Sequence, residues 1–169
     1  MMESVMNGLM KHALTALALA LLIQPVSAQE VKDPNYRGGF HYSGNNVAPA
    51  KDDSLYKALG GEEKIAAFTK DFVGIIKDDP KIGKFFDGVN LERLAQQLTR
   101  QFIDLSGGPV KYAGRDMTEA HAQMGVSNGD FNKLAEDLEI AMDHASIDYV
   151  TQTRLIALLA PMQKSVVTK

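Results

Sequence analysis

The sequence contains no cysteine and no tryptophan, and its 169 residues include only four histidines. Without cysteine, the chain cannot form disulfides, thiolate-ligated zinc or iron–sulfur sites, a thiol nucleophile, or a haem attached through a CxxCH motif. A formal net charge of -3 and a pI of about 5.8 lack the basic excess of a nucleic-acid-binding protein. The length and the 45% hydrophobic content fit one soluble globular domain with a short appendage.

The first 28 residues have the pattern of a secretory signal peptide. A weakly basic start at Lys11 and His12 precedes an apolar run over 13–23, which is shorter than the about 20 residues that a membrane-spanning helix needs. Small residues then lead to Ala28, as before a signal peptidase site. We expect a Sec-type signal cleaved after Ala28, a periplasmic or secreted protein, and no stable membrane insertion after cleavage. An uncleaved membrane anchor is the alternative.

The rest of the chain divides into a linker over residues 29–53 and a helical domain over residues 54–169. The linker is rich in Gly, Asn, Pro and Lys and has no helical or strand period, which indicates flexibility. Beyond residue 54 the apolar residues recur with a helical period throughout, so we expect an all-α domain. The last helix is expected to run from Ser146 to about Val167, with a kink at Pro161. The expected N-caps are Ser54, Asn90, Asp116, Ser127 and Ser146.

His121 is the histidine that the helical pattern turns toward the core. Met117, Ala120, His121 and Met124 recur at i, i+3, i+4 and i+7 in a short helix over 116–124. A buried imidazole can donate one N–H to a local backbone carbonyl, which leaves its other nitrogen as a lone-pair acceptor. Taken alone, His121 is either a core residue whose ring nitrogens are hydrogen-bonded or a metal ligand.

The surroundings of His121 decide which metal site the sequence permits. A zinc or non-haem iron site needs three or more converging side-chain ligands, and no second ligand is apparent near His121. The other histidine of the helical domain, His144, lies near the end of the next helix, where a positive charge suits the helix dipole. A haem needs only one axial protein ligand in an apolar surround. Haem is therefore the metal site that this composition permits.

From Ser54 to about Met162, the chain resembles the group I truncated haemoglobins. The similarity rests on the order and spacing of several short motifs that end at an Ala-His pair. They are Ser54-Leu55-Tyr56, Leu59-Gly60-Gly61, Asp78-Asp79-Pro80, Phe85-Phe86, Gly107-Gly108-Pro109, Tyr112, Gly114-Arg115-Asp116-Met117 and Glu119-Ala120-His121. The resemblance implies a two-on-two helical sandwich that holds a noncovalent haem b, with His121 as the proximal iron ligand.

The resemblance also assigns expected roles to other residues around the haem. Phe86 corresponds to the phenylalanine that packs on the haem face, with Phe85 beside it, and Met117 shares the stripe of His121. Phe102 matches a position that can line a ligand tunnel, although core packing explains it equally well. A further group lies where family members meet the haem propionates, or else on the solvated surface. This group consists of Arg93, Lys111 and Tyr112.

The sequence departs from the family where the gas ligand would bind. Group I members usually carry a Phe-Tyr pair on the second helix, whereas this chain has Phe72 followed by Val73. The positions that commonly supply a polar group above the iron match Leu94 and Leu98. An apolar pocket without a hydrogen-bond donor predicts weak O2 retention and easy oxidation. The neighbouring Gln97 and Gln101 either turn inward or lie on a solvated flank.

Three functions follow from these observations. The first is reversible binding of O2, NO or CO by a haem protein, as a carrier, store or sensor. The second is a haem enzyme that consumes NO or peroxide, which the missing distal acid or base disfavours. The third is a haem-free helical interaction module that keeps only the scaffold. A Soret band that depends on His121 would dismiss the third.

Overall fold

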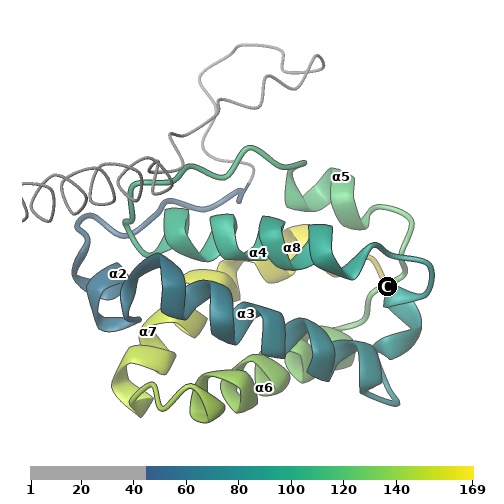
Figure 1. Cartoon of the computed structure of the whole chain (residues 1–169). Coiled ribbons are helices and arrows are strands. Elements are labelled where there is room, and N and C mark those ends of the chain that lie inside the picture. The colour runs from purple at the N-terminus through teal and green to yellow at the C-terminus, as the bar shows by residue number, and fades with distance from the viewer. Residues whose placement is uncertain (1–44) are drawn as a thin grey trace, which may run out of the picture. The chain divides into compact units, whose positions relative to one another are not determined.

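The computed structural model describes residues 45–169, and the predicted signal peptide and linker residues 29–44 lie outside the described part (Figure 1). Within residues 45–169 the chain forms helices joined by turns, with no strand. The elements are α2 (Ser54–Ala58), α3 (Gly61–Asp78), η1 (Gly83–Phe86), α4 (Leu91–Leu105), α5 (Met117–His121), α6 (Asn128–His144), α7 (Tyr149–Leu159), η2 (Ala160–Met162) and α8 (Gln163–Val166).

The helices form a sandwich of two pairs. Helix α3 packs against both α4 and α6, and α7 contacts α4 and α6, so that α3 and α4 lie over α6 and α7 (Figure 1). The short helix α5 lies at the edge of this arrangement and packs chiefly on α8. The predicted two-on-two fold is therefore confirmed.

The main core is built from the apolar faces that the helical period predicts. On α3, Ile65, Phe68, Phe72 and Ile76 are all buried. Phe68 stacks on Phe102 of α4, with ring centroids 5.9 Å apart. Since a buried large side chain contributes about 1.5–3 kcal/mol, this α3–α4 contact is a main source of the fold's stability.

Three of the expected N-caps are confirmed and two are wrong. Asn90, Asp116 and Ser127 each accept a hydrogen bond from the backbone N–H three residues later, and Ser127 with Asp130 forms a full capping box. Ser54 instead lies inside α2. Ser146 has φ of 52° in the preceding turn, and Asp148 caps α7 by accepting from the N–H of Thr151.

The predicted kink at Pro161 and the predicted linker boundary at residue 53 also differ from the structure. The helix does not merely kink at Pro161, because α7 ends at Leu159 and a 3-10 turn joins it to α8. Residues 45–53 of the predicted linker pack on the helical domain. Asn45 is fully buried, and the N–H of Ala50 donates to the carbonyl of Leu105 at 2.8 Å.

Helices within residues 45–169 are too short or too polar to cross a bilayer.

Candidate functional site

An apolar cavity lies between the sandwich and the turn that follows α5. Its volume is about 120 Å³. Five of the residues expected around the haem line this cavity: Phe85, Phe86, Leu94, Leu98 and His121. The lining also includes residues that the sequence placed only on apolar helix faces or did not assign to the site. These are Phe72, Ile76, Ile82, Met124, Val126, Asp130, Phe131, Leu134 and Val166.

His121 is held in one orientation by its own helix. Its Nδ1 lies 2.8 Å from the carbonyl oxygen of Met117, one turn earlier. A carbonyl can only accept, so Nδ1 carries the proton and Nε2 keeps a free lone pair in the neutral ring. The half-buried ring lines the apolar cavity. This is the tautomer that a metal-binding imidazole needs.

The part of the cavity wall that α3 and α4 supply is aliphatic and aromatic. Leu94 and Leu98 of α4 and Phe72 of α3 supply it. Val73, which was expected beside the gas ligand, is buried but is not among the lining residues. The expected place of Val73 at the gas ligand therefore finds no support in this cavity.

Gln101, Met117 and Phe102 lie in the interior but outside the cavity lining. Gln101 is only 4% exposed, so of its two alternatives the solvated flank is wrong, and the side chain turns inward without lining the cavity. Its Nε2 points at the sulfur atoms of Met117 and Met162, at 3.4 and 3.9 Å. Met117 belongs to a second, smaller apolar cluster, and Phe102 lies in the main core. For Phe102, the core-packing alternative agrees with its stacking on Phe68.

The three residues expected near the haem propionates also lie outside the cavity lining. Lys111 Nζ is 3.1 Å from Oδ1 of the buried Asp104, whose Oδ2 accepts from the N–H of Tyr112 at 3.3 Å. The Tyr112 hydroxyl donates to the carbonyl of Arg115, and burial raises the pKa of Tyr112. Arg93 is exposed in the first turn of α4. These contacts order the loop before α5.

Asp130 is the carboxylate among the lining residues, and its side chain is hydrogen-bonded in the capping box of α6. Its Oδ2 accepts from the Ser127 hydroxyl at 2.6 Å and from the Ser127 N–H at 3.0 Å. The hydroxyl hydrogen bond and then the N–H hydrogen bond lower the pKa of Asp130 below its ordinary value of 3.8. Asp130 is thus an anionic capping group and not a proton donor to the cavity at neutral pH.

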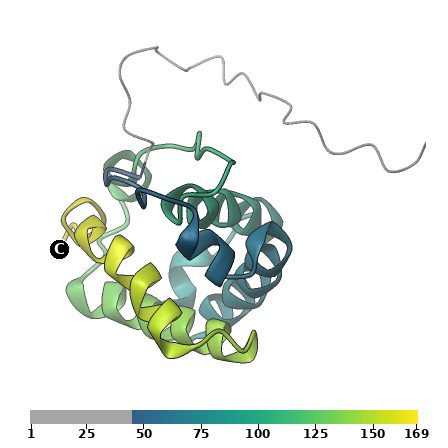
Figure 2. The same ribbon diagram turned by 90° about the vertical axis from the view of Figure 1, so that its left-hand side faces the viewer.

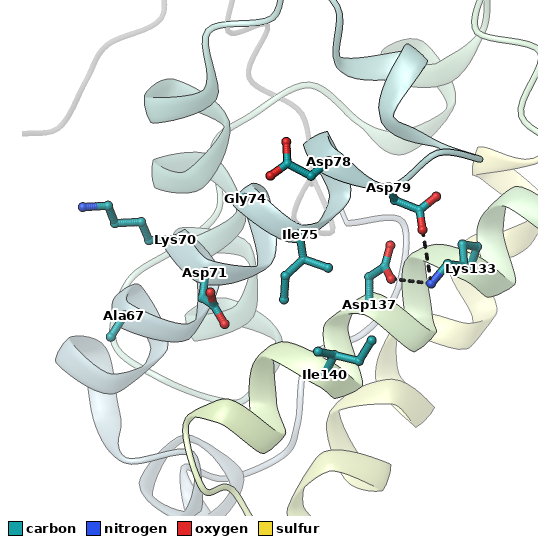
Figure 3. Close-up of a pocket in the computed structure, with 10 residues that line it drawn as sticks. All are labelled: Ala67, Lys70, Asp71, Gly74, Ile75, Asp78, Asp79, Lys133, Asp137 and Ile140. Carbon is teal, nitrogen blue, oxygen red and sulfur yellow. Dashed lines mark hydrogen bonds and ion pairs between the residues drawn. The ribbon is translucent and has the colours of Figure 1, made fainter.

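A larger groove on the far side of α3 has no histidine among its lining residues (Figure 3). It has a volume of about 820 Å³ and runs between α3 and α6. Lys133 Nζ lies 2.5 Å from Asp137 and 3.3 Å from Asp79, and the hydrogen bond with Asp137 contributes most to raising the pKa of Lys133. Across the described residues, no cluster of three or more His, Asp or Glu side chains could hold a metal ion.

Comparison with known proteins assigns the fold to a family. The model of the bacterial-like globins matches residues 54–168. A group 1 truncated hemoglobin of Tetrahymena pyriformis is 30% identical over 97 residues, which are 57% of this chain and 80% of that protein. This chain belongs to the group I truncated globins. Its relatives include the group 1 truncated hemoglobin GlbN of Mycolicibacterium paratuberculosis, 27% identical over 119 residues, which are 70% of this chain and 88% of that protein.

Solved structures agree with this assignment. The Fe(III) form of the T. pyriformis truncated hemoglobin aligns with a TM-score of 0.66 at 26% identity, over 68% of this chain and 98% of that one. The 2/2 hemoglobin of Synechococcus sp. PCC 7002, with covalently attached heme, shares the fold at a TM-score of 0.61 and 22% identity, over 66% of this chain and 94% of that one. A haem-binding globin function follows from the family.

The residues of this truncated globin fit a haem in their chemistry. One imidazole offers its Nε2 from an otherwise apolar surround, which suits the single axial ligand that a porphyrin-bound iron takes from the protein. In size, the cavity of about 120 Å³ is smaller than the 300 Å³ or more of typical ligand pockets. We therefore expect the cavity wall to open when haem binds.

Proposed function

We propose that this truncated globin binds haem b noncovalently through Nε2 of His121 and reversibly binds a diatomic gas such as O2, NO or CO. The observation that carries this proposal is the hydrogen bond from His121 Nδ1 to the Met117 carbonyl, beside an apolar cavity. That bond fixes the tautomer and increases the basicity of Nε2. Haem, when bound, supplies an iron with a coordination position open to the gas.

The side chains around the cavity favour gas binding over acid–base catalysis. Leu94, Leu98 and Phe72 exclude water and offer neither a proton donor nor an acceptor. The carboxylate of Asp130 is engaged by the Ser127 hydroxyl and N–H. These side chains bind the gas through shape and apolar contact alone. Ligands that depend least on a hydrogen bond, CO and NO, are therefore favoured relative to O2.

We also propose that residues 1–28 direct export through the Sec route and are removed after Ala28. The support is the sequence pattern alone, which combines a short apolar run with small residues before the cleavage site. A Sec-exported chain crosses the membrane unfolded, so the haem is acquired outside the cytoplasm. Mass spectrometry of the protein recovered from the periplasm or medium tests this, because cleavage predicts an N-terminus at Gln29.

Spectroscopic titration with haemin tests the haem-binding proposal. The wild-type chain is expected to develop a Soret band, and its ferrous form is expected to give a CO-shifted band. His121→Ala should weaken haem binding by more than about tenfold, since even partners in a metal's outer shell are worth that much.

The matched control is His144→Ala. This exposed histidine pairs with Asp71 at 2.7 Å and does not line the cavity. The control should bind haem as the wild type does. Equal haem affinity in His121→Ala and His144→Ala would contradict the assignment of the ligand, and a wild-type chain without a Soret band would contradict haem binding altogether.

A further inference from the structure

The helix that carries His121 has little support from the sandwich. Helix α5 has five residues, and its main helical partner is α8. Helices this short are unstable in isolation, because the nucleation cost exceeds what a single turn returns. The hydrogen bond between His121 Nδ1 and the Met117 carbonyl exists only while this turn is formed. Contacts that keep α5 folded therefore also keep the His121 ring in its orientation.

The segment before α2 makes one of these contacts. Asn46 Nδ2 donates to Thr118 Oγ1 of α5 and to Ser165 Oγ of α8, both at 3.2 Å. Asn46 has φ of 58°, a left-handed conformation that asparagine tolerates better than most residues. One side chain thus joins three segments that are far apart in the sequence. Figure 2 shows the N-terminal part of the described chain beside α5.

The C-terminal residues hold the loop that follows α5. The N–H of Thr168 donates to the carbonyl of Val126 at 2.9 Å, and the N–H of Val126 donates to Thr168 Oγ1 at 3.2 Å. This pair of hydrogen bonds fixes the chain five residues after His121. The first turn of α5 and the loop after it are consequently each tied to a terminal segment of the domain.

Apolar contacts reinforce these hydrogen bonds. Val47 packs against a small cluster that contains Met117 of α5, Met162 of η2 and Val166 of α8. Met117 and Val166 are each 7% exposed. The contact buries apolar area that α5 could not bury against the sandwich.

We propose that residues 45–50 and 165–168 form a terminal clasp that orients His121 toward the haem iron and slows haem loss. Asn46, Thr118, Ser165 and Thr168 are its positioning residues. The clasp stabilises the α5 turn, the turn keeps the Met117 carbonyl within reach of Nδ1, and that bond keeps Nε2 aimed along one direction. This inference rests on the proposed haem binding by His121.

Haem loss and an iron–histidine spectrum test the clasp in the full chain. Asn46→Gly removes the side chain while tolerating the positive φ, and Thr118→Val removes the hydroxyl while keeping the shape. Each variant should still form a Soret band but transfer haem to a haem-free acceptor globin about threefold to tenfold faster, the range expected for one lost hydrogen bond. The iron–histidine stretching band of the ferrous protein should shift or broaden.

Two variants serve as controls. Thr118→Ser keeps the hydroxyl and should restore wild-type haem loss and the wild-type band. Thr153→Val removes an exposed hydroxyl that donates to the Tyr149 carbonyl within α7, and it should change neither quantity. A normal Soret band with unchanged haem loss and band in Asn46→Gly and Thr118→Val would overturn the clasp alone. A wild-type chain without a Soret band would overturn the clasp and the proposed function together.

Discussion

Leu94 and Leu98 line the same cavity as His121, and neither can donate a hydrogen bond. A donor in a dry pocket stabilises a partly negative O2 ligand by about 1.5–3 kcal/mol, which corresponds to roughly a tenfold to hundredfold effect. For the proposed haem protein we therefore expect fast O2 dissociation and ready oxidation of the ferrous form. The nearby polar side chain of Gln101 does not compensate, because its Nε2 is directed to the sulfurs of Met117 and Met162.

Leu94→Gln tests this reasoning directly. The new amide should slow O2 dissociation by about tenfold or more while changing CO dissociation much less, because CO gains little from a donor. Stopped-flow displacement of O2 from the ferrous protein measures the rate. Leu94→Met, which is similar in volume but has no N–H, is the control and should behave as the wild type. A slow rate in the wild type itself would disprove the apolar-pocket hypothesis.

The local signals in the sequence were sufficient for most helices but ambiguous at two starts. Ser54 and Ser146 satisfy the N-cap preference, yet each has an aspartate nearby that competes for the same role. Asp148 accepts from both the N–H and the hydroxyl of Thr151, at 3.1 and 2.7 Å. Ser146 lies in a left-handed turn, where it serves the connection between α6 and α7.

Removing each candidate cap should show which one supports α7. Asp148→Ala should lower the free energy of unfolding by about 1 kcal/mol, the usual contribution of an N-cap. Ser146→Ala should have a smaller effect, since it removes no cap. Urea denaturation followed by circular dichroism measures both values. A larger loss in Ser146→Ala than in Asp148→Ala would contradict the observed helix start.

The capping aspartates also predict a dependence of stability on pH. The hydrogen bond from the Thr151 hydroxyl, followed by that from the Thr151 N–H, lowers the pKa of Asp148 below its ordinary value of 3.8. A carboxyl group whose pKa is lower in the folded state stabilises the fold above its unfolded pKa, and this contribution is lost as pH falls through the folded pKa. Stability should therefore decrease on acidification below about pH 4.

Asp148→Asn separates this effect from general acid unfolding. The amide still accepts a hydrogen bond but does not titrate, so the variant should lose less stability than the wild type between about pH 5 and pH 3. Urea midpoints at the two pH values provide the comparison. Equal losses in the two proteins would show that the Asp148 cap contributes nothing to acid sensitivity.

At the scale of the whole molecule, the sequence predicted the sandwich and the orientation of His121 but not the role of the chain ends. The period of apolar residues is a local signal, and it was enough for α3, α4 and α6. The burial of Asn45 and the contacts of Asn46 depend on residues more than 50 positions away. No local pattern distinguishes such residues from a solvated linker. The salt bridge of Lys111 with Asp104, only seven residues apart, was missed for another reason, because no helical period relates the two residues across the turn that follows α4.

The size of the cavity gives a prediction about the whole domain. At about 120 Å³, the space beside His121 is well below the about 300 Å³ or more of typical ligand pockets. The main core around Phe68 and Phe72 is closely packed and resists displacement. Helix α5 packs chiefly on α8, and Met117, Val126 and Phe131 belong to or pack on the smaller apolar cluster, so haem entry should widen the cavity on this side.

Haemin should therefore stabilise the domain and change its dynamics locally. Ligand linkage predicts about 2.7 kcal/mol of added stability at a hundredfold excess over Kd, seen as a melting temperature that rises with haemin concentration. Hydrogen exchange with and without haemin should change most at residues 117–131 and least in the middle of α3, because only the former region has to move. His121→Ala should reduce both responses, whereas His144→Ala should retain them. Equal changes in exchange along α3, α7 and residues 117–131 would show that the core itself rearranges to admit the haem.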